Sequence, residues 1–155
     1  VYQRQEMSQL VLRHGDHHFG DCRTVHIWLT WNDKENANLM VLLAYILLGH
    51  PDWSDAEISV FAALPTTEVE KQRGDLEQLM FEGRIPISEK NVGFISVNDV
   101  KSFRDIVAER SADADLVIVG FDLEGLAKKK VGLFQAHASL KAVLFVRAAE
   151  AIAIE

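Results

Sequence analysis

The stretch Leu116-Val117-Ile118-Val119-Gly120 decides the fold class. Its four consecutive aliphatic side chains stand between Asp115 and a glycine, so the segment has no polar face. Such a run is typical of a central parallel strand that is covered on both sides. Similar short apolar runs occur on either side of it along the chain, and helical patterns separate them. We therefore expect a sheet with helices on both faces.

Working outward from this stretch, the sequence predicts five strands, at residues 25–30, 58–62, 93–97, 116–119 and 142–146. The intervening segments predict helices at about 35–48, 67–82 and 98–110, with a weaker helical pattern over 123–137. Strands that alternate with helices pair in parallel through right-handed crossovers. The expected fold class is therefore α/β, with a doubly wound five-stranded parallel sheet.

The two ends of the chain lie outside this alternating series. Residues 1–24 are expected to be a lead-in from a preceding domain or an edge segment, because Leu10-Val11-Leu12 has the content of an edge strand. Residues 25–147 form the predicted α/β domain, and 148–155 form an alanine-rich tail. The chain starts at Val1 without an initiator methionine, so we expect it to be a piece of a longer protein.

Composition excludes several classes of protein. The 155 residues are 48% hydrophobic, which suits one domain with one substantial core. A net charge of -7 makes nucleic acid an unfavourable partner. The single cysteine, Cys22, cannot form an internal disulfide framework, so a reducing, cytosolic compartment is expected. The longest apolar run, 39–48, is half the length of about twenty residues that a membrane-spanning helix needs.

A ligand of such a sheet is expected beyond the carboxyl ends of the strands, where the strand order reverses. The sequence puts bulky and acidic residues there: Trp31 and Asp33 after the first strand, and Phe121 and Asp122 after the fourth. Glycines 120, 125 and 132 match neither the dinucleotide-binding spacing nor the P-loop spacing. The sequence therefore predicts no phosphate site and no bound cofactor at this edge, and no catalytic residue is identified.

Histidines 14, 17 and 18, with Asp16 and Asp21, are residue types that bind zinc. They lie in an irregular segment without a rigid element, so we favour solvated loop histidines and leave metal binding as the alternative. Cys22 next to this segment is interpreted as a plain thiol, because no nearby group is evident that would lower its pKa.

Two further charged groups have simple interpretations. Asp113 and Asp115 precede the fourth strand, at the edge opposite the expected ligand crevice, and are expected to solvate a loop. The run 128–130 consists of three lysines and is interpreted as a solvated helix face. Binding of an anionic lipid headgroup is the alternative for this run, although such sites usually contain about four to eight basic residues.

Three tryptophans are candidates for packing or for contact with a partner. Trp28 lies within the first predicted strand and is expected in the core. Trp31 follows that strand, and Trp53 follows the apolar helix. For Trp31 and Trp53, local packing and a protein interface are equally favoured, so both are possible interface residues.

Several of these segments together resemble the cytosolic C-terminal region of cation-chloride cotransporters. The first group comprises 26–33 with its two tryptophans and acidic turn, the apolar helix 38–48, and 53–61 with its tryptophan and Ile-x-Val-Phe strand. The second group runs from 111–120 to the strand at 141–147. The short connections between these segments resemble a prokaryotic member of the family.

This resemblance implies a fold similar to universal stress proteins and a non-catalytic, dimeric domain that regulates or assembles an electroneutral salt transporter. The partners would be a second copy and the transmembrane part of the same chain, on the cytoplasmic side of the membrane. The alternative function is a nucleotide sensor of the universal stress protein type. Many universal stress proteins bind ATP through a glycine-rich sequence after the fourth strand, and this chain has Leu123 where the second glycine would stand.

Overall fold

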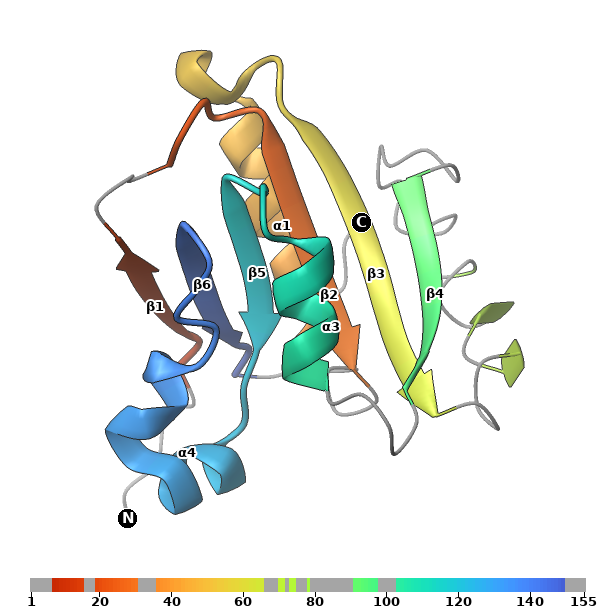
Figure 1. The fold of residues 1–155 in the computed structure, drawn as a ribbon, viewed down its shortest axis with the longest axis vertical. Coiled ribbons are helices and arrows are strands. Elements are labelled where there is room, and N and C mark those ends of the chain that lie inside the picture. Colours follow the sequence, from red (N-terminus) through yellow and green to blue (C-terminus); the bar gives the residue numbers. More distant parts are fainter. Residues whose placement is uncertain are drawn as a thin grey trace.

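The structure is a computed structural model that describes residues 7–15, 19–30, 36–65, 70, 71, 73, 74, 78, 91–97 and 103–149. Within these residues six strands form one sheet in the order β1-β6-β5-β2-β3-β4 (Figure 1). The strands are β1 (Gln9–His14), β2 (Thr24–Thr30), β3 (Glu57–Pro65), β4 (Val92–Val97), β5 (Leu116–Gly120) and β6 (Ala142–Arg147).

Strands β2 to β6 all run parallel to one another. The chain moves from β2 outward to β3 and β4, then crosses back to β5 and continues to β6 on the other side. This order is that of a doubly wound fold, and it confirms the predicted α/β class. Each of the five strands predicted from the sequence is present.

The predicted strand count needs one correction, because the sheet has a sixth strand, β1. It pairs antiparallel with β6, from Gln9 opposite Arg147 to His14 opposite Ala142. For residues 1–24 the sequence predicts a lead-in or an edge segment, with Leu10-Val11-Leu12 as a possible edge strand, and β1 is that edge strand. Its physical role is to pair with the backbone groups of β6 that would otherwise be left open at the edge of the sheet.

The helices whose bounds are described are α1 (Ala37–Leu48), α3 (Phe103–Arg110) and α4 (Leu123–Lys129), with short 3-10 helices η2 (Pro51–Trp53) and η5 (Lys130–Gln135). The weak pattern over 123–137 thus divides into α4 and η5. Most of the predicted helix at 67–82 lies outside the described residues. Within that segment Arg73 is helical, and its guanidinium lies 4.7 Å from the ring centre of Phe94 in β4.

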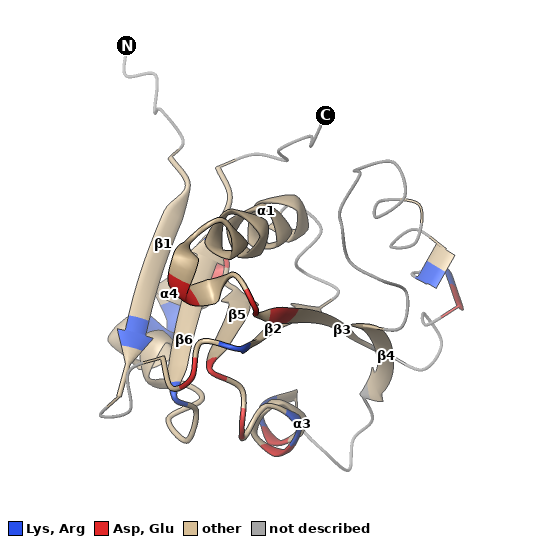
Figure 2. Ribbon diagram, turned by 90° about the horizontal axis from the view of Figure 1, so that it is seen from above, with Lys and Arg blue, Asp and Glu red and all other residues tan. Residues whose placement is uncertain are grey.

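Side chains that alternate along the strands pack into two separate hydrophobic cores, one on each face of the sheet. On one face Ile27 and Ile118 pack with Met40 of α1. On the other face Trp28 and Val119 pack with Val107 of α3. Figure 2 shows these two helices on opposite sides of the sheet.

The central strand β5 has the double-sided burial that its sequence predicted, since Leu116 to Val119 are at most 4% exposed. No helix in the described part of the chain combines the length and the apolar content that crossing a membrane requires.

Candidate functional site

The switch point of the sheet lies between β2 and β5, which are neighbours. The helix that follows β2 covers one face, and α4 and η5, which follow β5, pack against the other. Connections that leave neighbouring strands toward opposite faces diverge at the carboxyl ends of those strands, and ligands of open α/β sheets bind there. The candidate site therefore comprises the described residues that follow β2 and β5, which begin at Asn36 and Phe121.

Asn36 and Phe121 close this edge from within the chain. The amide Nδ2 of Asn36 donates to the carbonyl oxygen of Phe121 at 3.2 Å, and its Oδ1 accepts from the N–H of Ala148 at 2.8 Å. The N–H of Phe121 donates to the carbonyl of Val146 at 3.0 Å. Asn36 is only 5% exposed and Phe121 only 6%. One side-chain amide therefore joins the ends of β5 and β6 to the start of α1.

This role of Asn36 differs from what the sequence predicted. The sequence predicts a helix from about residue 35, and residues 31–35 lie outside the described residues. The helix α1 begins at Ala37, and Asn36 occupies the N-cap position without making a side-chain cap bond. Its side chain instead forms hydrogen bonds to the backbone after β5 and β6, so a polar group is buried at a position where no sequence pattern indicates one.

Asp122 occupies the amino end of α4. Its carboxylate accepts from the N–H of Gly125 at 2.6 Å, which is an N-cap contact. A side chain at position 125 would place its Cβ 3.0 Å from that carboxylate oxygen, so glycine permits the close approach. Glu124 in the same turn is exposed and forms an ion pair with Lys128 at 3.0 Å. An anion at this position would meet two carboxylates, and one of the backbone donors is already used.

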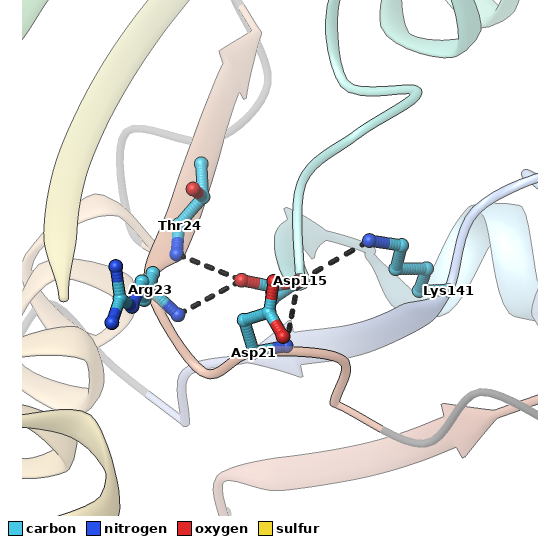
Figure 3. A network of polar contacts seen from close by, with 5 residues as sticks. All are labelled: Asp21, Arg23, Thr24, Asp115 and Lys141. Atoms are coloured by element: carbon cyan, nitrogen blue, oxygen red, sulfur yellow. Dashed lines mark hydrogen bonds and ion pairs between the residues drawn. The ribbon is translucent and has the colours of Figure 1, made fainter.

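The opposite, amino edge of the sheet contains a second polar network around Asp115 (Figure 3). Its carboxylate accepts hydrogen bonds from the backbone N–H of Arg23 at 2.8 Å, of Thr24 at 3.1 Å and of Asp21 at 3.3 Å. The Lys141 ammonium group lies 3.4 Å from the same carboxylate. Asp115 is 3% exposed, so the interpretation of this residue as a loop-solvating carboxylate is wrong. Asp113 is exposed.

The environment of Asp115 determines its charge. Burial alone would raise the pKa of its carboxyl group, but the hydrogen bonds from Arg23, Thr24, Lys141 and Asp21 outweigh burial and lower the pKa. The carboxylate is therefore ionised at neutral pH and holds the loop before β2. Gly20 in this loop has φ +57, and a Cβ there would collide with the Asp115 carboxylate, so the loop requires glycine at this position.

The predicted metal alternative involves His14, Asp16, His17, His18 and Asp21, of which the structure describes the first and the last. Asp16, His17 and His18 lie outside the described residues, so the alternative stays a prediction. His14 is in β1, and the described residues contain no group of three or more His, Cys, Asp or Glu side chains placed to hold a metal ion. For the nearby Cys22, burial and then the carboxylates of Asp52, Asp115 and Asp21 raise the pKa of the thiol, which disfavours the reactive thiolate.

The tryptophans have different surroundings. Trp28 is fully buried, as predicted, and stacks on Phe61 with ring centres 4.7 Å apart. Trp53 is 5% exposed and meets Phe19 edge-on at 5.6 Å, which is local packing within the chain. Trp31 lies outside the described residues. A contact between chains through Trp31 and Trp53 stays a prediction, and the burial of Trp53 leaves it little surface to contribute.

A buried polar cluster under α3 was missed by the sequence reasoning. Ser111 is fully buried, and its Oγ lies 2.8 Å from Nδ1 of His26 and accepts from Nε1 of Trp28 at 2.8 Å. With one lone pair taken by the indole N–H, the hydroxyl is free to donate to the imidazole. Burial lowers the pKa of His26, so the ring is neutral at pH 7. Ser111 is 85 positions from His26 and 83 from Trp28 in sequence, so no local pattern indicates their contact.

Comparison with known proteins supports the fold. No protein-family model and no curated protein matches the sequence. The chain is similar to the crystal structure of the cytoplasmic domain of a prokaryotic cation chloride cotransporter, with a TM-score of 0.61 and 21% sequence identity. The match covers 96% of this chain and 55% of that chain, so this chain spans about half the length of the solved domain. At this identity the likeness shows a shared fold, which agrees with the resemblance predicted from the sequence.

Proposed function

We propose that this chain is a non-catalytic cytosolic domain of a cation-chloride cotransporter and that it has a regulatory and dimerising role. The fold likeness to the cytoplasmic domain of a prokaryotic cotransporter supports the transporter assignment. The observation that carries the non-catalytic part is the closed switch point. There the chain's own Asn36 and Phe121 fill the edge of the sheet at which a doubly wound domain ordinarily binds its ligand.

The alternative is a nucleotide sensor of the universal stress protein type. Such a sensor needs free backbone N–H groups after the fourth parallel strand, which is β5 here. In this chain the Asp122 carboxylate accepts from the N–H of Gly125, and Glu124 adds a second negative charge beside it. These two carboxylates favour the transporter domain over the nucleotide sensor.

An exposed apolar surface supports the dimerising role. The surface, which we call the α1–β1 surface, consists of Leu10, Leu12, Tyr45 and Ile46, each about half or more exposed. The helix α1 contains no charged residue. Leu10 and Leu12 pair across β1 and β6 with Val146 and Leu144, which belong to the core under α1, so the two leucines face the same side as the helix. Apolar surface gathered on one side suits an isologous contact with a second copy.

Light scattering coupled to size exclusion tests the dimer over about 1 to 100 μM, a range that covers moderate affinities. The mass is expected near twice 17.4 kDa at high concentration and to fall on dilution. Ile46→Glu is expected to give a monomer throughout. Val131→Glu is the matched control, because Val131 is 71% exposed but lies on η5, and it should leave the dimer intact. A single monomeric mass for the unchanged chain at every concentration would assign dimerisation to another part of the protein.

The transporter assignment has a separate and decisive test. The reading frame that encodes Val1 should also encode about a dozen apolar segments, each about twenty residues long, which is the length that spans a bilayer. Finding instead another stress-type domain, or no membrane segment, would contradict the assignment and favour the nucleotide sensor.

A further inference from the structure

The edge strand β1 is attached to the sheet by few buried apolar contacts. Within the described residues it pairs on one side only, with β6, and its side chains alternate between exposed and partly buried. Leu10 and Leu12 are about half exposed, whereas Val11 packs against the core under α3. A strand with so little apolar burial detaches locally at a lower cost in free energy than the central strands do.

The side chain of Arg13 extends from β1 to the turn that follows η5. Its guanidinium donates hydrogen bonds to the carbonyl oxygen of Phe134 at 3.0 Å and to those of Ala136 and His137. Carbonyl groups at the end of a helix have no partner within it, and the five N–H groups of a planar guanidinium suit several such acceptors at once. The guanidinium carbon also lies 5.9 Å from the ring centre of Phe145. One side chain of β1 therefore holds the end of η5.

The segment that Arg13 holds has little burial of its own. No side chain of α4 or η5 is fully buried, and Leu126, Leu133 and Phe134 pack only partly buried against the core under α3. The backbone of His137, just after η5, has φ +61, which a residue other than glycine rarely adopts. Such a conformation persists only where surrounding contacts impose it, so the position of η5 depends on the hydrogen bonds from Arg13.

The ring of Phe134 connects this segment to the switch point. It meets the ring of Phe121 edge-on, with centres 5.4 Å apart, and the ring of Phe145 at 5.2 Å. The carbonyl oxygen of Phe121 accepts from the Asn36 amide at the closed edge of the sheet. A continuous set of contacts therefore runs from Arg13 through Phe134 and Phe121 to Asn36.

We propose that β1 is a strap that keeps the switch point closed and that it acts through Arg13, a positioning residue. While β1 is paired with β6, the guanidinium holds the end of η5, and the Phe134 ring packs on Phe121. When β1 leaves the edge of the sheet, these carbonyl groups lose their donor, η5 loosens, and Phe121 loses the ring beside it. The closed carboxyl edge then opens. This device goes beyond the proposed function, because it applies equally to a transporter domain and to a nucleotide sensor.

Amide hydrogen exchange of the 155-residue chain, followed by nuclear magnetic resonance, tests the strap. Arg13→Gln should speed exchange at least about tenfold at two places, the effect of losing charge-assisted hydrogen bonds. The first place is the end of η5, where the N–H groups of Ala136 and Leu140 report on the turn. The second is the switch point, where the N–H groups of Phe121 and Ala148 report on the closed edge.

The amides of the β2–β3 pair are the internal reference, and their exchange should be unchanged. Equal acceleration at these amides would mean a global loss of stability. Acceleration at Ala136 and Leu140 without a change at Phe121 and Ala148 would mean that Arg13 holds only the turn. Either result would overturn the strap, and so would unchanged exchange at all of these amides.

The matched control is Arg147→Gln, at the opposite end of the same strand pair. The Arg147 guanidinium donates to the side chain of Gln9 at 3.0 Å and to the carbonyl oxygen of Met7 at 2.9 Å. The substitution thus removes the same charge and two hydrogen bonds of β1 that do not involve η5. Exchange at Ala136 and Phe121 should be unchanged. Equal acceleration in the two arginine variants would mean that any weakening of the edge opens the switch point, which would overturn the assignment to one side chain.

Phe134→Leu separates the two steps of the device. It removes the ring that meets Phe121 but keeps the backbone carbonyl that Arg13 binds. Exchange at Ala148 should therefore rise while exchange at Leu140 stays slow. Adding Arg13→Gln should give no further rise at Ala148, because both substitutions break the same path. Additive effects at Ala148 would overturn the path through the ring, and none of these results bears on the dimer or on the membrane segments of the reading frame.

Discussion

The two ends of the parallel sheet use their buried polar groups differently. At the amino end, the charged carboxylate of Asp115 accepts three backbone N–H groups and lies beside Lys141. At the carboxyl end, the neutral amide of Asn36 joins two neighbouring connections. The ionic network thus lies at the amino end of the strands, where doubly wound folds do not bind ligands. At the carboxyl end, where such folds ordinarily bind them, the connections are joined by an uncharged amide.

The difference shows that the two ends of one doubly wound sheet satisfy buried polar groups by different means, a charged carboxylate at one end and a neutral amide at the other. A binding edge must keep donors unpaired in the absence of ligand, which costs free energy in the empty domain. Here Asp115 at the amino end and Asn36 at the carboxyl end pair their polar atoms with other groups of the chain. The comparison predicts that substitutions at the amino end cost more stability than substitutions at the carboxyl end, and that a nucleotide finds no donors at the latter.

The largest loss of stability is expected from a substitution in β5, the central strand that runs from the amino end of the sheet to its carboxyl end. Ile118→Asp puts a carboxylate into a site that is 1% exposed, so we expect the domain to unfold or to lose several kcal/mol of stability. Val131→Asp is the control, since Val131 is 71% exposed on η5, outside the α1–β1 surface, and should tolerate the charge. Thermal and urea unfolding measure both. An unchanged midpoint for Ile118→Asp would contradict the position of β5 at the centre of the sheet.

The next largest loss of stability is expected from a substitution at the amino end of the sheet. Asp115→Ala leaves the N–H groups of Arg23 and Thr24 without their acceptor and should cost about 2–4 kcal/mol in the free energy of unfolding. Asp113→Ala removes an exposed carboxylate two residues away and should change stability by less than about 0.5 kcal/mol. Similar losses for the two variants in urea titrations would mean that Asp115 has no special structural role.

Acid should lower the free energy of unfolding by protonating Asp115 at the amino end of the sheet. Its pKa is lower in the folded than in the unfolded chain, so its contribution is complete above the unfolded pKa and is lost as pH falls through the folded one. The pKa of His137 is about 4 in the folded chain and 6.5 in the unfolded chain, so between these values only the unfolded chain takes up the proton. The free energy of unfolding should therefore decrease as pH falls below 6.5. The free energy of unfolding is measured across pH for Asp115→Asn and for His137→Gln. Asp115→Asn should lack the decrease caused by protonation of Asp115, and His137→Gln should lack the decrease that begins below pH 6.5. A full dependence in both variants would contradict these assignments.

A smaller loss is expected at the carboxyl end. Asn36→Ala removes the bonds to Phe121 and Ala148 and should cost about 1–3 kcal/mol. The matched control is Asn38→Ala in the first turn of the same helix, because the Oδ1 of Asn38 has no hydrogen-bond partner. If Asn36→Ala cost more than Asp115→Ala, the ranking of the two ends would be reversed.

The smallest effect is the absence of nucleotide binding at the switch point. The dissociation constant of MgATP at this edge should be millimolar or weaker, because the carboxylates of Asp122 and Glu124 repel a triphosphate. The amide signals of Gly120 and Gly125 report on this edge specifically, and they should not move on titration. Saturable shifts of these amides at micromolar nucleotide would favour the nucleotide sensor.

The parallel strands were predictable because their side chains carry the signal locally. The run 116–119 has no polar face, and the structure buries both of its sides. The contacts of Asn36, Asp115 and Ser111 were not predictable, because each side chain meets partners roughly 80 or more residues away, and nothing near it in sequence specifies them. For Asp115 the sequence placed the residue at the correct edge but could not indicate that a loop folds over it.

The antiparallel pairing of β1 with β6 also determines how the domain would respond to mechanical load. Gln9 at the start of β1 lies opposite Arg147 at the end of β6, and the N–H of Ala149 donates to the hydroxyl of Ser8. The described chain therefore enters and leaves the sheet at the same corner. Tension between these two points opens the hydrogen bonds of the pair one after another, starting at that corner, whereas tension along parallel neighbours loads many bonds at once. A pull on the flanking segments would release β1 first and leave the five parallel strands in place.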